Sequence, residues 1–263
     1  MVGLATLVGI AVASPRSIFG FESVLCFLTG FFISSYSMIL NDYYDLESDM
    51  LSAPSRVLPS GRMSPRRAIH LSLVMLSLGL VSAGLLGLGN LLIAGIFSFL
   101  SWLYSHSAKK AGLLGNFIVS LSVAIPYVYG AVAVGRGMDE FVWLLSATSF
   151  LACLGREVIK TIPDVKGDEV RGVRSVARVH GPEFAARLGA LFFVLAVASS
   201  LLPVALGLSG PAYTISILPV DAYFLYLSYR IARNFEEALE VKRLALFGML
   251  AGIIAFTLGG IFR

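Results

Sequence analysis

The sequence predicts an all-α integral membrane protein with nine transmembrane helices. Of its 263 residues, 57% are hydrophobic and only 14% are charged, whereas a soluble domain carries roughly 25% charged residues. The apolar residues also come in long runs, most of them close to the roughly 20 residues that cross a bilayer core. Each run must be helical, because hydrocarbon offers no partner for an open backbone. We expect the spans at residues 2–13, 18–41, 67–86, 88–105, 115–134, 140–159, 184–207, 212–230 and 243–262.

The first apolar run, residues 2–13, is short for a span. It lacks the basic region that begins a signal peptide, and the next apolar run follows almost at once. We therefore interpret it as a first helix that starts abruptly, as expected in a shortened chain. The other eight runs need no such explanation.

The basic residues predict the orientation. Under the nine-span topology, all of the twenty Lys and Arg residues except Arg16, Arg136 and Arg263 fall at one side of the membrane. The positive-inside rule makes that side cytoplasmic and the protein a multi-pass component of the cell membrane. These residues lie beside hydrophobic spans and no nucleic-acid motif is present, so we exclude nucleic acid as a partner. We expect membrane lipid around the bundle and no obligate protein partner.

An acidic motif opens the first large loop on the cytoplasmic side. Asn41, Asp45 and Asp49 are four residues apart, so on a helix they share one face. Repeated carboxylates repel each other unless a cation lies between them, and Mg²⁺ prefers hard oxygen ligands together with substrate phosphates. The spacing therefore predicts Mg²⁺ ligands and catalytic residues, with Asp42 as a further candidate ligand.

A second acidic motif occurs in the second large loop on the same side. Asp164 and Asp168 repeat the four-residue spacing, and they follow Asp45 and Asp49 at the same distance along the chain. We expect one transmembrane domain over residues 1–263, built from a weak repeat of helices 1–4 and 5–8 with helix 9 added. The two acidic faces would oppose each other across a cavity at the repeat interface. The competing interpretation is that the acids are solvated loop charges.

Further polar residues at this end are candidates for substrate binding. Lys160 precedes Asp164 by one helical turn, and the fourth helix ends on Tyr104 while the fifth opens with Asn116. Contacts with lipid headgroups, or a place in the interfacial aromatic belt for Tyr104, remain the alternatives. The basic residues that we place near phosphate are Arg56, Arg62, Lys109, Lys160 and Arg171.

Asp221 stands apart, because it lies in the middle of the eighth predicted span. An ionisable group inside a membrane span is a functional hypothesis by default. We expect Asp221 to face the central cavity and contact substrate, or else to make a hydrogen bond that packs two helices together.

These motifs resemble those of the UbiA superfamily of intramembrane prenyltransferases over nearly the whole chain. The matching segments are NDYYDLESD at 41–49, PSG at 59–61, YSHSAK at 104–109 and DVKGD at 164–168. Residues 155–172 look most like the archaeal branch that makes digeranylgeranylglyceryl phosphate. Family members usually begin with a basic stretch and an Arg-Pro-x-x-Asn-like segment, which is absent here, so no acceptor contact on the first helix can be transferred.

The resemblance implies an integral membrane bundle of nine transmembrane helices around a central cavity, with two Mg²⁺ ions bridged by a prenyl diphosphate. Asn41, Asp45 and Asp49 match the family's first motif, and Asp164 and Asp168 match its second. Tyr104 and Lys109 match the family's Tyr–Lys signature. Arg56 matches the basic residue after the first motif, although the Arg-Pro usual there is Arg-Val in this sequence.

The resulting functional prediction is Mg²⁺-dependent transfer of a geranylgeranyl group from its diphosphate to a lipid acceptor. The acceptor that the resemblance favours is the hydroxyl of geranylgeranylglyceryl phosphate, in archaeal ether lipid biosynthesis. Prenylation of an aromatic acceptor, such as 4-hydroxybenzoate or a quinone precursor, is the alternative enzyme. A CDP-alcohol phosphotransferase would need one contiguous acidic motif, whereas this sequence divides its acids over two loops. A Mg²⁺ transporter, the non-enzyme alternative, would need polar residues through the whole depth of the spans, where we identify only Asp221.

Overall fold

The computed structural model describes residues 2–170 and 172–263, and these residues form helices and turns with no strand among them. The long helices are α2 (Phe21–Tyr44), α4 (Pro65–Leu86), α5 (Leu88–His106), α6 (Leu113–Ala133), α7 (Glu140–Lys160), α10 (Pro182–Ala205), α11 (Pro211–Arg233) and α12 (Ala238–Ile261), preceded by the shorter α1 (Val2–Ala13). The remaining elements are η1 (Pro15–Ser17), α3 (Leu46–Ser52), η2 (Ala108–Lys110), α8 (Val165–Val170), α9 (Val176–His180) and η3 (Phe235–Glu237).

Each predicted span coincides with one of these helices. The largest difference in boundary lies at α12, which begins at Ala238 where the sequence predicts residue 243. Charged residues in its first turns, such as Glu240 and Lys242, hide the start of this helix from a hydropathy pattern. The chain is therefore an all-helical bundle, and the positions of its helices could be read from the sequence.

Seven helical segments are long and apolar enough to cross a membrane: α2, α4, α5, α6, α7, α10 and residues 235–261. The structure thus supports a multi-pass membrane protein. Helix α1 has twelve residues and is about 18 Å long at 1.5 Å per residue, which is too short to span a bilayer core alone. Helix α11 is long enough, but Asp221 and its prolines and tyrosines make it less apolar. Nine crossings remain a prediction.

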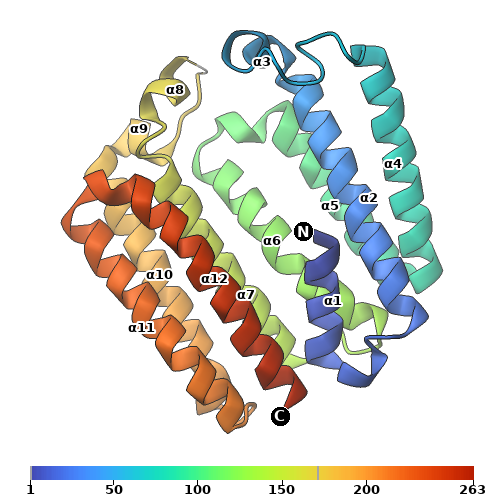
Figure 1. Ribbon diagram of the computed structural model, residues 1–263, viewed down its shortest axis with the longest axis vertical. Helices are drawn as coiled ribbons and strands as arrows, with labels where there is room; N and C mark the ends of the chain where they lie inside the picture. The colour runs from blue at the N-terminus through green and yellow to red at the C-terminus, as the bar shows by residue number, and fades with distance from the viewer. Residues whose placement is uncertain (1, 171) are drawn as a thin grey trace.

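The helices pack in the same order in the two halves of the bundle. The first half comprises α1, α2, α4 and α5, and the second comprises α6, α7, α10 and α11. Helix α2 packs closely against α4 in the first half, and α7 packs closely against α10 in the second. Helices α1 and α6 contact each other where the two halves meet (Figure 1). Small residues allow the closest approach: a Cβ atom on Gly130 would lie 2.1 Å from the Thr6 carbonyl oxygen, and one on Gly9 would lie 2.1 Å from that of Tyr127. Close backbone contact of this kind is typical of helices in membranes.

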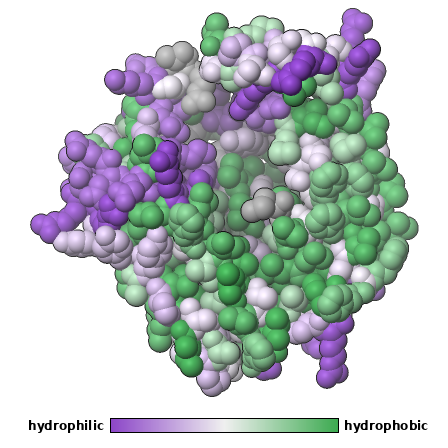
Figure 2. Space-filling view, viewed as in Figure 1, coloured by the Kyte–Doolittle hydropathy of each residue, from purple (hydrophilic) through white to green (hydrophobic). Residues whose placement is uncertain are grey.

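The two ends of the bundle differ from its flanks. Large apolar side chains such as Leu88, Ile215 and Phe247 are exposed along the flanks, and the visible face is largely hydrophobic there (Figure 2). Hydrophilic groups gather at the end that carries α3, α8 and α9 (Figures 1 and 2). At the opposite end Arg263 forms an ion pair with Asp139, which also caps α7 through the Val142 amide.

Candidate functional site

A cavity of about 730 Å³ lies at the polar end of the bundle. It is bounded by the ends of α2, α5 and α7, the start of α6, and the short elements η2, α3 and α8. Figure 2 shows the molecule hollowed at this end, between hydrophilic groups on either side. The cavity brings together side chains from both acidic motifs: Asn41, Asp42, Asp45, Asp164 and Asp168.

The first motif lies where α2 passes into α3. Asp45 separates the two helices with φ −91° and ψ 0°, so the motif is divided between two helices. Backbone hydrogen bonds from the Asp45 amide to the Asn41 carbonyl (2.9 Å) and from the Asp49 amide to the Asp45 carbonyl (2.8 Å) carry the helical pattern across. Asn41 Nδ2 donates to Asp45 Oδ2 at 3.0 Å, and Lys109 forms an ion pair with the same carboxylate.

Asp49 has a different environment from Asp45. Its side chain is buried and does not line the cavity; it accepts a hydrogen bond of 2.7 Å from Arg56 Nη1. This contact raises the pKa of the Arg56 guanidinium above its ordinary value, so Arg56 remains a cation. Arg56 also lies 3.7 Å from Asp42. It therefore contacts the first motif from outside the cavity, rather than facing into it as a phosphate ligand would.

The second motif faces the first from the other half of the bundle. Asp164 precedes α8 and Asp168 lies within it, and the Asp168 amide donates to the Asp164 carbonyl at 2.9 Å. Asp168 is buried at the cavity wall. Lys242 Nζ on α12 lies 3.9 Å from Asp164 Oδ1. Asp45 and Asp164 thus each lie beside a lysine from a distant part of the chain, whereas the partner of Asp49 is the nearby Arg56.

Three predicted binding residues, Tyr104, Asn116 and Lys160, also line the cavity, as Lys109 does. Lys160 Nζ donates to Glu157 Oε2 at 2.9 Å. Glu157 was missed by the sequence analysis, although it lies inside a predicted span, where a carboxylate is a functional signal. It is buried, lines the same cavity, and its other oxygen accepts from Arg156 at 2.7 Å.

Three other predicted binding residues are placed elsewhere. Arg62 lies outside the cavity and donates to the Ser55 carbonyl at 2.6 Å, which ties down the loop before α4. Arg171 lies outside the described residues. Asp221 lines a separate, small cavity enclosed by α6, α7, α10, α11 and α12. The sequence placed it at the central cavity, but it does not line the cavity that contains the acidic motifs.

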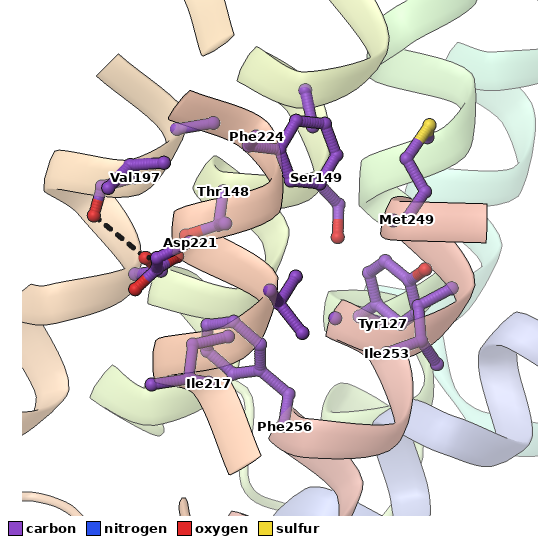
Figure 3. A pocket seen from close by; sticks show the side chains of 16 residues that line it. Tyr127, Thr148, Ser149, Val197, Ile217, Asp221, Phe224, Met249, Ile253 and Phe256 are labelled. Carbon is purple, nitrogen blue, oxygen red and sulfur yellow. Dashed lines mark hydrogen bonds between the residues drawn. The ribbon is translucent and has the colours of Figure 1, made fainter. Parts of the chain in front are cut away.

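The small cavity around Asp221 is mostly apolar. Its walls include Phe224, Ile253 and Phe256 (Figure 3). Ser200 Oγ on α10 donates to Asp221 Oδ1 at 2.7 Å, while Oδ2 is buried without a partner among the described residues. The hydrogen bond joins α10 to α11, which agrees with the helix-packing alternative for Asp221.

The acids at the polar end fit a metal that is held together with a phosphate. Among the described residues, no three His, Cys, Asp or Glu side chains converge as a cage for a bare ion. Carboxylates line the cavity on two sides, with Asp42, Asp45 and Glu47 from the first half of the chain and Glu157, Asp164 and Asp168 from the second. Mg²⁺ commonly takes one or two carboxylates and completes its coordination with water and phosphate oxygens. This donor set therefore fits Mg²⁺ bound with a diphosphate.

An apolar groove of about 560 Å³ adjoins the acidic cavity. Residues of α1, α2, α5 and α6 line it, and it shares Ser37 and Met38 with the cavity. Its hydroxyl groups are largely satisfied within their own helices; Ser122, for example, donates to the Ile118 carbonyl at 2.8 Å. An apolar chain in the groove would therefore place a polar head group at Asn41 and Asp45, above Ser37 on α2.

The chain is similar to known proteins along nearly its whole length. Residues 2–259 match the model of the UbiA prenyltransferase family. Digeranylgeranylglyceryl phosphate synthase from Archaeoglobus fulgidus is 31% identical over 265 aligned residues, which cover 98% of this chain and 90% of the relative. The enzyme of the same name from Methanopyrus kandleri is 33% identical over 256 residues, covering 97% and 93%.

Solved structures share the fold. One that concerns digeranylgeranylglyceryl phosphate synthase in membranes matches with a TM-score of 0.89 and 31% identity over 99% of this chain and 93% of the other. A UbiA homologue from Archaeoglobus fulgidus, bound to DMAPP and Mg²⁺, matches with a TM-score of 0.71 at 17% identity, covering 97% and 95%. At that identity the second likeness concerns the fold alone.

Proposed function

The chain belongs to the UbiA prenyltransferase family, and from this premise we propose that it transfers a geranylgeranyl group to the hydroxyl of geranylgeranylglyceryl phosphate. The donor is geranylgeranyl diphosphate and the reaction depends on Mg²⁺. Full-length similarity to digeranylgeranylglyceryl phosphate synthases supports this acceptor.

One observation carries the proposal: both acidic motifs line a single cavity that adjoins an apolar groove. Carboxylates and lysines at the mouth suit a metal diphosphate, whereas the groove suits an isoprenoid tail. A substrate with both parts would place its reactive carbon near the boundary marked by Ser37 and Met38.

Asp45, Asp164 and Asp168 would hold Mg²⁺ from the two sides of the cavity. When bound, Mg²⁺ neutralises the diphosphate and stabilises the negative charge that develops on this leaving group. The number of ions is part of the proposal; we expect two. Asn41 orients the Asp45 carboxylate through its hydrogen bond, and Arg56 holds Asp49 and the adjoining turn in place.

Lys109 contributes a positive charge at the mouth of the cavity, where it contacts Asp45. In the reaction the bond between the allylic carbon and the diphosphate oxygen breaks. The acceptor hydroxyl oxygen bonds to that carbon, the hydroxyl proton is released, and the products are an ether and diphosphate. The apolar walls of the groove limit attack by water on the allylic carbon.

We extend the proposal to topology. All Lys and Arg residues but three lie at the acidic end under nine crossings, which supports a cytoplasmic site. The similar helix pairing of the two halves supports a repeat of four helices within one domain at residues 1–263.

The identity of the product tests the function. Purified protein receives labelled geranylgeranyl diphosphate and Mg²⁺, with geranylgeranylglyceryl phosphate or 4-hydroxybenzoate in parallel. We expect a labelled ether lipid and no prenylated ring. A prenylated aromatic with no ether would replace the acceptor, and product formation that persists after complete chelation of divalent cations would contradict the metal requirement.

A further inference from the structure

Two hydrogen-bond donors on the wall of the acidic cavity are not used by the reaction described above. Ser175 is 2% exposed, and neither its Oγ atom nor Asn116 Nδ2 has a hydrogen-bond partner among the described residues, although both atoms are buried. Both residues line the cavity. Buried polar groups are nearly always paired, so two such donors on one wall indicate that a ligand supplies the acceptor atoms.

The backbone brings these two donors to the same place. Gly112 adopts φ +63°, and a Cβ atom there would lie 2.2 Å from the Arg174 carbonyl oxygen and 3.8 Å from Ser175 Cα. The Gly112 carbonyl in turn accepts from the Asn116 amide at 3.3 Å. Only glycine permits this approach, because its conformation is left-handed and the space for a side chain is filled. Gly112 therefore joins the start of α6 to the segment before α9.

Lys160 supplies a positive charge to the same cavity. The Ala177 amide donates to Thr161 Oγ1 at 3.3 Å, which holds the start of α9 against the end of α7. Lys160 precedes Thr161, lines the cavity, and is fixed at 2.9 Å by buried Glu157. An ammonium group and two neutral donors form a set that binds phosphate oxygens without a metal.

We propose that Ser175, Asn116 and Lys160 form a subsite for the phosphate monoester of the acceptor, separate from the carboxylates that hold the donor diphosphate. Glu157 is a positioning residue that keeps Lys160 at this wall. This inference rests on the proposed function, because it assumes that one substrate is a glycerol phosphate.

The position of the groove favours the acceptor over the donor as the occupant. The groove meets the cavity at Ser37 and Met38 on α2, so a donor tail places its diphosphate toward Asp45 and Lys109. The elements α7 and α9 lie on the other side of the bundle from α2 (Figure 1). Asp164 and Asp168 on that side are assigned to the donor diphosphate, so Lys160 and Ser175 would bind the phosphate of a second substrate beside it.

The test compares two acceptors, the glycerol lipid with its phosphate and the same lipid alcohol without it. In wild type, kcat/KM should favour the phosphorylated lipid. In Ser175→Ala we expect KM for the phosphorylated acceptor to rise about tenfold, since one hydrogen bond to a charged group is lost. KM for geranylgeranyl diphosphate and turnover of the alcohol should stay unchanged. Ser209→Ala is the matched control, because Ser209 Oγ is also buried without a partner among the described residues but lies outside this cavity.

Asn116→Asp gives a second, independent result. It retains the size of the side chain but replaces a donor with a negative charge, so it should lower preference for the phosphorylated acceptor more than Ser175→Ala does. An unchanged preference in both variants, or an equal rise in KM for the donor, would overturn the subsite. If wild type makes no ether from either lipid, the proposed function has failed instead.

Discussion

Replacing Asp45 with asparagine should separate the catalytic role of the first motif from its structural role. The substitution keeps the size of the side chain and removes one negative charge. Asp45 contacts Lys109 and Asn41, and its side chain is 28% exposed. Asparagine keeps an oxygen that can accept a hydrogen bond from Lys109, so the loss of the charge should cost about 1–3 kcal/mol and the bundle should remain folded.

The effect on the reaction should be far larger than the effect on folding. Loss of one group that stabilises developing charge typically lowers kcat by about 10²–10³-fold, and we expect that range for Asp45→Asn. The assay is the initial rate of geranylgeranyl transfer in detergent, with the thermal unfolding midpoint measured on the same sample. Glu183→Gln is the control, because Glu183 is an exposed carboxylate whose only partner among the described residues is Arg187, at 4.0 Å. A folded Asp45→Asn variant that keeps more than about a tenth of the wild-type rate would refute the role assigned to Asp45.

Two further substitutions probe the groove and the bundle. Ala94→Phe places a large side chain in the apolar groove that Ala94 lines. It should slow the transfer of geranylgeranyl about tenfold and the transfer of the shorter farnesyl group less. Equal losses for both donors would argue against the groove as the site of the isoprenoid tail. Gly130→Ala places a Cβ atom 2.1 Å from the Thr6 carbonyl oxygen, so it should destabilise the packing of α1 on α6 by about 1–3 kcal/mol. Thermal unfolding in detergent measures this loss of stability. Gly84→Ala is the control, because no atom lies within 4 Å of a Cβ atom there.

The hydropathy pattern predicted where the helices lie, because long apolar runs in a bilayer have one stable conformation. The same pattern also predicted crossings at α1 and α11, which are shorter or less apolar than the other helices, since α1 has twelve residues and α11 carries Asp221. The depth of Asp221 suggested a place in the central cavity. Its direction around α11 depends on contacts with α10, which a single sequence does not contain.

The spacing of the acids predicted which residues meet, but not what each one contacts. Asp45 and Asp164 line one cavity from opposite halves, as the matched motifs indicated. Asp49 does not line the cavity and pairs with Arg56. Ser175 was not identified, because a lone serine in a loop has no spacing signal, and its significance depends on burial and on a missing partner.

Equilibrium binding of labelled geranylgeranyl diphosphate tests most directly the claim that acids from both halves hold one metal diphosphate. Binding to wild type, Asp45→Asn and Asp164→Asn would be measured with Mg²⁺ and after its removal. We predict that wild type binds only with Mg²⁺ and that each substitution weakens binding about tenfold or more. Binding that survives removal of Mg²⁺, or that depends on only one of the two aspartates, would contradict the account.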